Sequence, residues 1–148
     1  MAGLYYEEFH VDQEFEHPWG RTITESDNMN FSCLTLNVQP LHIDAEFAAG
    51  TEFGKPLVNS LFTLGLMIGM TVNDTTLGTT VANLGMSDVR FPKPLFHGDT
   101  IRVRSKVRSM RESGSRPAGI ITEAVRLCRA DGTLLIEAEH ISLIRKAP

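Results

Sequence analysis

The stretch Pro56–Val72 reads PLVNSLFTLGLMIGMTV and is the most apolar segment of the chain. Its apolar residues fall on every side of a helical wheel, so we expect a helix that is buried all round. Seventeen residues is the low limit for crossing a bilayer, and polar residues interrupt the run, so a membrane span is the weaker interpretation. Gly65 and Gly69 would let a sheet or a partner helix approach this helix closely.

Downstream of this helix the sequence is typical of strands. In Ile101–Arg108 apolar residues alternate with Arg and Lys, which predicts a half-buried strand with a basic outer face. We interpret that face as solvated, with a ligand site as the alternative. The other predicted strands are Val81–Phe91, Ile120–Cys128 and Leu134–Ile144, and Asp131–Gly132 is the hairpin turn before the last one. One apolar helix followed by four long strands predicts an α+β protein with the hotdog architecture, an antiparallel sheet curled around a central helix.

Upstream of the apolar helix the sequence predicts one strand and one helix. Residues 14–24 are typical of an edge strand, bent at Pro18-Trp19-Gly20. Thr24 has the position of a helix N-cap, and acidic residues follow it in the first turn. We expect this helix to run to the loop at Asn37 and to be partly buried. The residues expected to bury it are Met29, Phe31, Cys33, Leu34 and Leu36.

The segment Asn37–Asn59 joins a titratable histidine, His42, to the start of the apolar helix. Pro40 fixes its own φ and favours an extended residue before it, so we expect a stiff loop around His42 and no regular element. Asp44 is a predicted N-cap, and Gly50 is the predicted stop of a short helix. Polar residues on a loop before a buried helix are where a rigid scaffold commonly presents chemistry. The alternative is a surface histidine without a function, and the spacing alone does not decide.

Composition limits the partners of the protein. Fourteen Lys and Arg against eighteen Asp and Glu give a net charge of -4, so we expect neither nucleic acid nor a membrane as a partner. We predict a single domain over residues 1–148. Cys33 and Cys128 have no metal-like spacing, which predicts interior free thiols and no metal or cofactor. The N-terminal residues do not resemble a signal peptide, so the expected location is cytoplasmic.

Three stretches of the chain resemble one family. Residues 37–48 (NVQPLHIDAEFA) and residues 53–61 (FGKPLVNSL) resemble the hydratase motif of MaoC-like dehydratases and (R)-specific enoyl-CoA hydratases. Residues 90–100 (RFPKPLFHGDT) are similar to the strand and turn that follow the helix in that family. The resemblance extends from Ile23 to about Arg145. It implies a CoA thioester substrate and a homodimer or a dimer of dimers, with the substrate along the subunit interface.

The reaction that this resemblance implies is the addition of water to an enoyl thioester. Water must lose a proton near the β-carbon, a proton must reach the α-carbon, and the thioester oxygen must be stabilised as an enolate. Histidine is the residue type best suited to both proton transfers near neutral pH, so His42 is the candidate acid and base. The family places a backbone N–H donor for the oxygen at a helix start that aligns with Ser60, where glycine is usual.

The chain departs from the family motif at two further positions. The family normally has aspartate where this chain has Asn37, and asparagine where it has Gln39. An amide orients water but does not accept its proton, so we expect His42 to be both acid and base, with Asn37 holding the water. The alternatives are that Glu25 or Asp27 supplies the missing acid, or that catalysis has been lost.

The expected substrate class also follows from the resemblance. Residues 35–37, 57–62 and 115–117 resemble short MaoC-like hydratases that act on branched dicarboxylic thioesters such as mesaconyl-CoA or itaconyl-CoA. Polar residues at the helix start would receive the extra carboxylate or would simply cap the helix. The candidate substrate-binding residues are Gln39, Asn59, Thr63 and Arg116, of which Arg116, with Arg111 nearby, either meets CoA phosphates or is a solvated loop residue.

Two other classes of function stay open. A hotdog thioesterase needs a carboxylate on the central helix, and residues 56–72 contain neither Asp nor Glu, which disfavours this class. A non-catalytic protein that binds or senses acyl-CoA is the stronger alternative. Asn37 is what the loss of a catalytic acid would look like.

Overall fold

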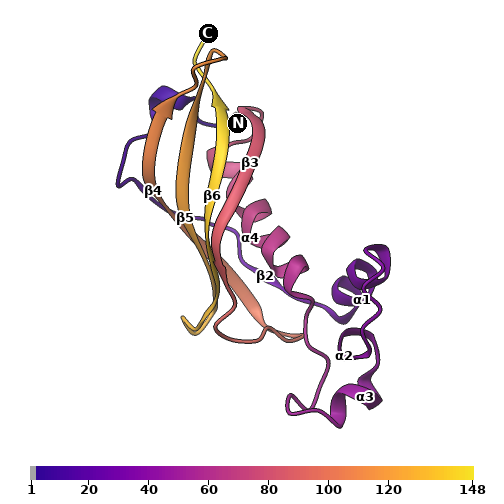
Figure 1. Cartoon of the computed structure of the whole chain (residues 1–148). Helices are drawn as coiled ribbons and strands as arrows, with labels where there is room; N and C mark the ends of the chain where they lie inside the picture. The colour runs from indigo at the N-terminus through magenta and orange to yellow at the C-terminus, as the bar shows by residue number, and fades with distance from the viewer. Residues whose placement is uncertain (1–2) are drawn as a thin grey trace.

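The structure is a computed structural model that describes residues 3–148. It has a long antiparallel sheet, one long helix against the sheet, and three short helices beyond its end (Figure 1). The helices are α1 (Glu25–Leu34), α2 (Pro40–Ile43), α3 (Ala45–Ala49) and α4 (Ser60–Thr75), after a 3-10 turn η1 (Tyr6–Glu8). The strands are β1 (Glu14–Glu16), β2 (Arg21–Thr22), β3 (Thr80–Arg90), β4 (Thr100–Glu112), β5 (Ala118–Arg129) and β6 (Leu134–Arg145). The predicted combination of one long helix with an antiparallel sheet is confirmed.

The sheet has the strand order β1-β4-β5-β6-β3, and β2 also pairs with β4. The interval between β1 and β2 contains Pro18-Trp19-Gly20, so the predicted bend and the predicted edge position are both confirmed. Asp131 and Gly132 form the turn between β5 and β6, where Gly132 has a φ of 91° that glycine adopts without strain. At the opposite edge, β3 pairs with β6 and with no other strand among residues 3–148.

One face of the sheet packs against α4 and forms the core. On β4, Ile101, Val103 and Val107 are buried, because alternate residues of a strand point to the same face. Met67 and Met70 of α4 are buried in the same hydrophobic cluster as the first two of these residues. The period-two pattern of β4 therefore decides which face of the sheet receives the helix.

The basic residues of β4 lie on the opposite, outer face. Arg104 is exposed and lies 3.0 Å from a carboxylate oxygen of Glu16. Lys106 is 3.2 Å from Asp12 and 3.2 Å from Glu14. These pairs join β4 to the N-terminal segment that lies along it, which favours the solvated-face interpretation of the basic stripe.

The helix predicted over Pro56–Val72 begins later than expected, at Ser60. The N–H groups of Leu57 and Val58 are already bonded to other parts of the chain, to the Leu41 and Leu95 carbonyls at 3.1 and 2.9 Å. Residues 57 and 58 therefore belong to an extended connection. Helix formation begins only after Asn59, which caps it.

The predicted burial of this helix on every side is wrong. The buried residues of α4 follow one stripe, whereas Leu61 is 60% exposed. The physical reason is that a single sheet covers only one side of a helix. A Cβ added at Gly65 or Gly69 would meet no atom of the described chain within 4 Å, so the sheet of this chain does not approach these glycines. A close approach by a partner helix stays a prediction. No helix among residues 3–148 combines the length and the apolar character that a membrane crossing requires.

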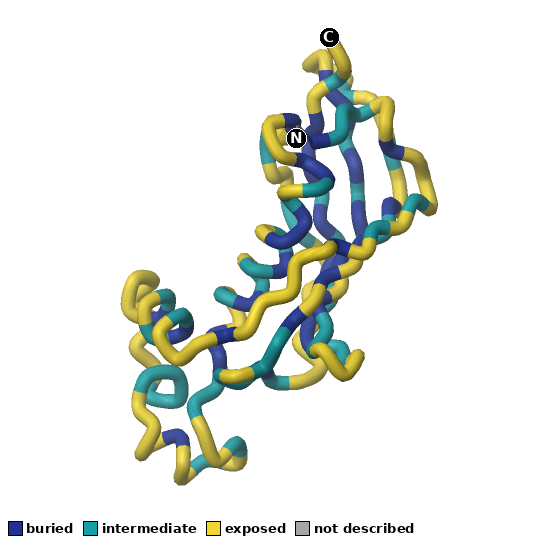
Figure 2. The backbone as a smooth tube through the Cα atoms, turned by 180° about the vertical axis from the view of Figure 1, so that it is seen from behind, coloured by how far each residue is buried: buried dark blue, intermediate teal, exposed yellow. Residues whose placement is uncertain are grey.

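Helices α1, α2 and α3 project beyond the sheet, and few of their residues are buried (Figures 1 and 2). The Thr24 capping box predicted at the start of α1 is confirmed. The predicted apolar burial of this helix is wrong at its end, because Cys33, Leu34 and Leu36 are exposed. The expectation of an interior thiol is therefore wrong for Cys33. Instead, the polar residues Asn28 and Ser32 are buried.

The expectation of a stiff loop without regular structure around His42 is also wrong. Pro40 is the first residue of the short helix α2, where its fixed φ suits a helix and its missing N–H costs nothing. Asp44 then caps α3 by accepting a hydrogen bond from the Phe47 N–H at 3.0 Å, and Gly50 ends that helix. Both of these predicted helix signals are confirmed.

Candidate functional site

His42 lies on α2, and its half-buried ring is held by one main-chain atom. Its Nδ1 is 2.8 Å from the carbonyl oxygen of Leu57. A carbonyl oxygen only accepts hydrogen bonds, so Nδ1 must carry the hydrogen. In the neutral ring, Nε2 then carries the lone pair. The geometry therefore leaves Nε2 as the atom that can accept a proton.

The extended connection at residues 57 and 58 delivers that carbonyl to the histidine. Leu57 donates its N–H to the Leu41 carbonyl at 3.1 Å, and it forms a β-bridge with Phe96. Val58 donates to the Leu95 carbonyl at 2.9 Å. The partner of His42 is thus fixed between α2 and the turn that leads into β4, and α4 begins two residues later.

The start of α4 is organised by Asn59, which is buried. Its side-chain oxygen accepts a hydrogen bond from the Leu61 N–H at 3.0 Å, and its amide nitrogen donates to the Ser32 hydroxyl at 3.2 Å. Thr63 is also buried, and its hydroxyl donates to the Asn59 carbonyl at 3.3 Å. These contacts favour the capping role of Asn59 and Thr63 over substrate binding. Ser60, the exposed first residue of the helix, has a backbone N–H without a partner inside the helix.

A residue that sequence reasoning missed, Asn28, connects these parts. Its amide nitrogen lies 3.1 Å from the His42 carbonyl and 3.1 Å from the Leu57 carbonyl. Its side-chain oxygen accepts the Asn59 N–H at 2.8 Å. The amide nitrogen is also 3.0 Å from Nε2 of His97. The only sequence signal was a pair of polar residues four apart on α1, Asn28 and Ser32, and such a pair is usually solvated.

Two of the residues at which the chain departs from the motif, Asn37 and Gln39, lie on the surface. Asn37 and Gln39 are exposed in the connection between α1 and α2. The Asn37 N–H bonds to the Ser32 carbonyl at 2.9 Å, which fixes the backbone of this residue. Its side chain is therefore available to a ligand or to a water molecule.

Asp27, considered as a substitute acid, has another role. It accepts the backbone N–H of Thr24 at 2.9 Å and pairs with Arg21. Partial burial acts to raise the pKa of this carboxyl, but the hydrogen bonds with Thr24 and the charge of Arg21 outweigh it and lower the pKa. Asp27 is thus an ionised capping residue, poorly suited to deliver a proton. Glu25 is exposed in the first turn of the same helix.

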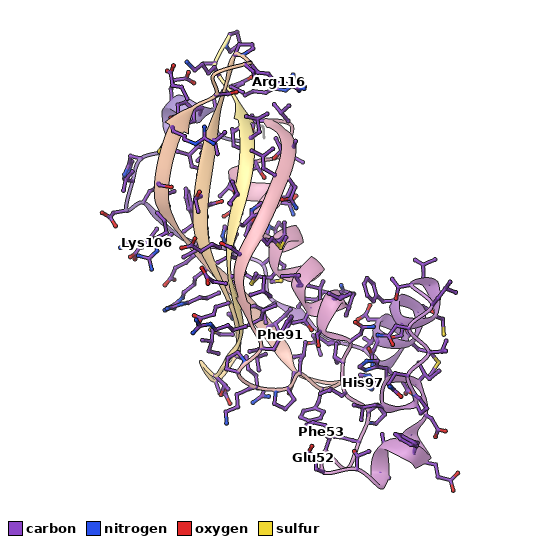
Figure 3. The ribbon with its side chains drawn as sticks, viewed as in Figure 1. Glu52, Phe53, Phe91, His97, Lys106 and Arg116 are labelled. Carbon is purple, nitrogen blue, oxygen red and sulfur yellow. The ribbon has the colours of Figure 1, made fainter. Side chains whose placement is uncertain are left out.

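A pocket of about 300 Å³ opens beside the start of α4. Ser60 and Thr63 line it from the helix, and Leu57 lines it from the extended connection. Phe53 and Phe91 lie at the same end of the molecule as His97 (Figure 3). The remaining wall comes mainly from the segment after β3. Phe53, Phe91, Lys93 and Pro94 also line this pocket.

Arg116 is not part of this cluster within one chain. It lies in the connection between β4 and β5, at the end of the molecule opposite to His97 (Figure 3). There it lines a shallow hollow with Arg145 and Lys146. The described chain therefore brings His42, Ser60, Asn59 and Thr63 to one end and leaves Arg116 at the other.

Comparison with known proteins decides the family. Residues 8–126 match the model of the MaoC like domain. The chain belongs to the MaoC-like domain family. It is 30% identical to the (R)-specific enoyl-CoA hydratase of Aeromonas caviae over 75% of this chain and 78% of that protein. It is 28% identical to mesaconyl-CoA hydratase of Cereibacter sphaeroides over 98% of this chain, and it spans 42% of the length of that relative.

Solved structures agree with this assignment of the MaoC-like chain. A protein from Archaeoglobus, described as a monoamine oxidase regulatory protein, superposes with a TM-score of 0.87 at 32% identity and covers 100% of this chain and 98% of its own. A Mycobacterium tuberculosis protein with a double hotdog fold superposes with a TM-score of 0.85 at 20% identity, over 99% of this chain and 45% of its own. The predicted resemblance to the MaoC family and the predicted hotdog fold are confirmed.

For a MaoC-like chain, this end of the molecule combines three chemical capacities. His42 offers one ring nitrogen with a lone pair, and Ser60 offers a main-chain N–H at a helix start. The pocket lined by Ser60 and by Leu57, the residue that His42 contacts, has both apolar walls and a lysine, Lys93. A proton acceptor, an anion-stabilising donor and a mixed pocket together suit chemistry on the acyl part of a thioester.

Proposed function

We propose that this protein is a hydro-lyase, which adds water reversibly across the double bond of an enoyl-CoA thioester. The observation that carries the proposal is the hydrogen bond from His42 Nδ1 to the carbonyl of Leu57, three residues before α4, because it leaves the lone pair for proton transfer on Nε2. The similarity to the Aeromonas caviae protein named (R)-specific enoyl-CoA hydratase supports it.

The proposed mechanism uses residues of this chain alone. Nε2 of His42 takes a proton from water as the water oxygen forms a bond to the β-carbon, and the π electrons move toward the thioester oxygen. The Ser60 N–H stabilises the enolate that develops there. The histidinium then returns its proton to the α-carbon, so one water is added and no proton is gained or lost. Asn37 orients the water without exchanging a proton, because an amide does not titrate in this range.

We infer that the substrate is a branched dicarboxylic thioester such as mesaconyl-CoA or itaconyl-CoA. The similarity to proteins named mesaconyl-CoA hydratase supports this class. The pocket supports it as well, since Lys93 and Ser60 give a mostly apolar space a cation and a hydroxyl for a second carboxylate. In this proposal Gln39, which is exposed two residues after Asn37, also contacts the substrate.

We also propose that the working unit is a homodimer or a dimer of dimers. Two features support a second copy, the exposed apolar side of α4 around Leu61 and the free edge of β3. A two-fold axis that pairs two β3 edges antiparallel would set the Arg116 end of one copy beside the His42 end of the other. Arg116 would then meet CoA phosphates across the interface. Sedimentation as a monomer at micromolar concentration would contradict this proposal.

The decisive experiment is an absorbance assay of enoyl thioester consumption with crotonyl-CoA, mesaconyl-CoA and itaconyl-CoA. We expect hydration, faster with the dicarboxylic thioesters than with crotonyl-CoA. The second candidate is a non-catalytic acyl-CoA sensor, which the amide at Asn37 and the similarity to a protein described as regulatory both favour. Saturable binding of these thioesters, measured by calorimetry, without turnover of any of them would establish that alternative.

A further inference from the structure

Asn28 is a fully buried polar residue in a part of the molecule that is otherwise mostly exposed. It lies on α1, 14 residues from His42 and 31 residues from Asn59 in the sequence. An amide buried this completely must have its donors and its acceptor satisfied, or it destabilises the fold. Its surroundings satisfy them with main-chain atoms from the two segments that form the candidate site.

The orientation of the Asn28 amide follows from its partners. The oxygen faces the N–H of Asn59, which only donates, and the nitrogen faces the carbonyls of His42 and Leu57, which only accept. Turning the amide over would replace three attractive contacts with three repulsive ones. Asn28 therefore holds α2, the extended connection and the start of α4 in one arrangement.

The Leu57 carbonyl is the atom through which Asn28 reaches the histidine. A carbonyl oxygen has two lone pairs, and here one accepts from Asn28 at 3.1 Å while the other accepts from His42 Nδ1 at 2.8 Å. The orientation of this carbonyl decides whether the hydrogen of the neutral ring rests on Nδ1. It thereby decides whether Nε2 has the lone pair that the mechanism needs.

His97 adds a third hydrogen-bond acceptor around the Asn28 amide nitrogen. Its Nε2 lies 3.0 Å from the Asn28 amide nitrogen, so it must accept, and the neutral ring carries its hydrogen on Nδ1. Asn28 then has three acceptors for two amide hydrogens. Among the natural side chains of this length, only asparagine offers one acceptor and two donors, which explains this residue at this position.

We propose that Asn28 is a positioning residue for His42, which holds the Leu57 carbonyl so that the ring hydrogen stays on Nδ1 and the lone pair on Nε2. The proposal rests on the proposed function of His42 as acid and base. Asn28 does not touch the reacting atoms in this scheme. It acts by selecting one tautomer of the residue that does.

The test replaces Asn28 with aspartate, which has the same shape but turns the donor into a second acceptor. Asn30→Asp is the matched control, since Asn30 is exposed on the same helix and the substitution changes the net charge equally. Nitrogen NMR of the histidine rings reports the tautomer in the free protein. Steady-state kinetics with the best thioester of the assay reports kcat and KM, and thermal melting reports folding.

In the wild type we expect the hydrogen of neutral His42 on Nδ1. In Asn28→Asp the new oxygen repels the Leu57 carbonyl, so the Nε2–H tautomer appears, and kcat falls roughly a hundredfold while KM changes less than about threefold. Asn30→Asp should match the wild type in all three measurements. A purely structural role for Asn28 would lower the melting temperature and leave the tautomer unchanged.

Two results would overturn the proposal. One is a wild-type His42 whose neutral ring carries its hydrogen on Nε2, and the other is an Asn28→Asp protein with the wild-type tautomer and kcat. If Asn28→Asp does not fold, Asn28→Ser, whose hydroxyl donates to one carbonyl only, is measured for the same change of tautomer. If the wild type hydrates no thioester, the proposed function fails, whereas the tautomer of the free protein still decides the positioning role.

Discussion

Two histidines in this molecule are each held through Nδ1, but they lie in different surroundings. His42 is half-buried in the projecting helices, and its partner is a neutral carbonyl. His17 is 4% exposed on the inner side of the sheet, and its Nδ1 lies 2.9 Å from both carboxylate oxygens of Asp74. Its Nε2 is 3.1 Å from the Ser105 hydroxyl, which gives the order Asp–His–Ser known from hydrolases.

The comparison shows that an Asp–His–Ser chain of hydrogen bonds does not by itself make a catalytic site. His17 has both ring nitrogens occupied, and Ser105 is itself buried and 3.1 Å from the Glu123 carboxyl. A substrate cannot reach a nucleophile that is closed in by its own sheet. His42 lacks a carboxylate partner, but one of its ring nitrogens is free, and the other contacts Leu57, which lines the pocket. The half-buried ring and the free lone pair therefore favour His42 over His17 as the catalytic histidine.

Hydrogen bonds also limit where the protons lie in the buried cluster that consists of His17, Asp74, Ser105 and Glu123. Ser105 has one hydrogen for two neighbours, His17 and Glu123, so the neighbour that does not receive it must donate to the serine oxygen. Burial raises the pKa of Glu123, although the hydrogen bond from Ser105 opposes this, and the charge of Asp74 raises it further.

Among the substitutions that test this comparison, the one at His42 is expected to change the rate of hydration most. His42→Ala should reduce hydration by about two to four orders of magnitude, because the acid and base of the proposed mechanism is removed. The melting temperature should change little, since the truncated ring is half-buried. His10→Ala, at an exposed histidine, is the control. Equal kcat in His42→Ala and the wild type would contradict the proposed mechanism.

The opposite result is expected at His17, where the side chain supports the fold. His17→Ala leaves Asp74 and Ser105 without their shared partner, which should lower the free energy of unfolding by about 3 kcal/mol. The specific activity of the folded fraction should stay at the wild-type value. Denaturant titration measures the first quantity, and an assay below the unfolding transition measures the second. A loss of activity without a loss of stability would assign His17 a part in catalysis.

A smaller effect on rate is expected at Asn37, which positions water without exchanging a proton. Asn37→Ala should lower kcat/KM by roughly one to two orders of magnitude, the cost of about 1–3 kcal/mol for one orienting hydrogen bond. Asn37→Asp should remain active and add an acidic limb to the pH profile of kcat/KM. If the wild type already shows such a limb and loses it in Glu25→Gln or Asp27→Asn, the acid comes from α1 instead.

The smallest effect is a change in how stability depends on pH. The pKa of Glu123 is raised in the folded protein above its ordinary value of 4.5, so between these two values the folded state holds more protons than the unfolded state. This carboxyl therefore makes stability fall as pH rises through that window. In Glu123→Gln the fall disappears, and the stability of the variant relative to the wild type increases with pH.

The measurement for Glu123→Gln is denaturant unfolding at a series of pH values from 4 upward, read as the difference between variant and wild type so that other groups cancel. His140 does not cancel in this way, because it is paired with Glu123 across β5 and β6, and its pKa is lowered by burial. Glu139→Gln, on the next residue of β6, is the control and should show no such trend. A constant difference for Glu123→Gln would show that folding does not raise the pKa of Glu123.

The sequence by itself determined the local structure and the family. Thr24, Asp44 and Gly50 were correctly assigned to helix ends, because a cap bonds to a backbone group only a few residues away. The alternation in β4 correctly gave its buried face, because neighbouring residues of a strand always point to opposite sides. The motif around His42 identified the family and the candidate acid and base for the same reason, since it is written in consecutive residues.

Only the tertiary structure decided which atoms surround that histidine and which side of the central helix is covered. The Leu57 carbonyl is 15 residues away from His42, and Asn28 bonds to Asn59 across 31 residues. No period in the sequence encodes contacts of that range. Likewise, the all-round apolarity of α4 is compatible with any number of covering layers, and the folded chain supplies only one, the inner face of its sheet.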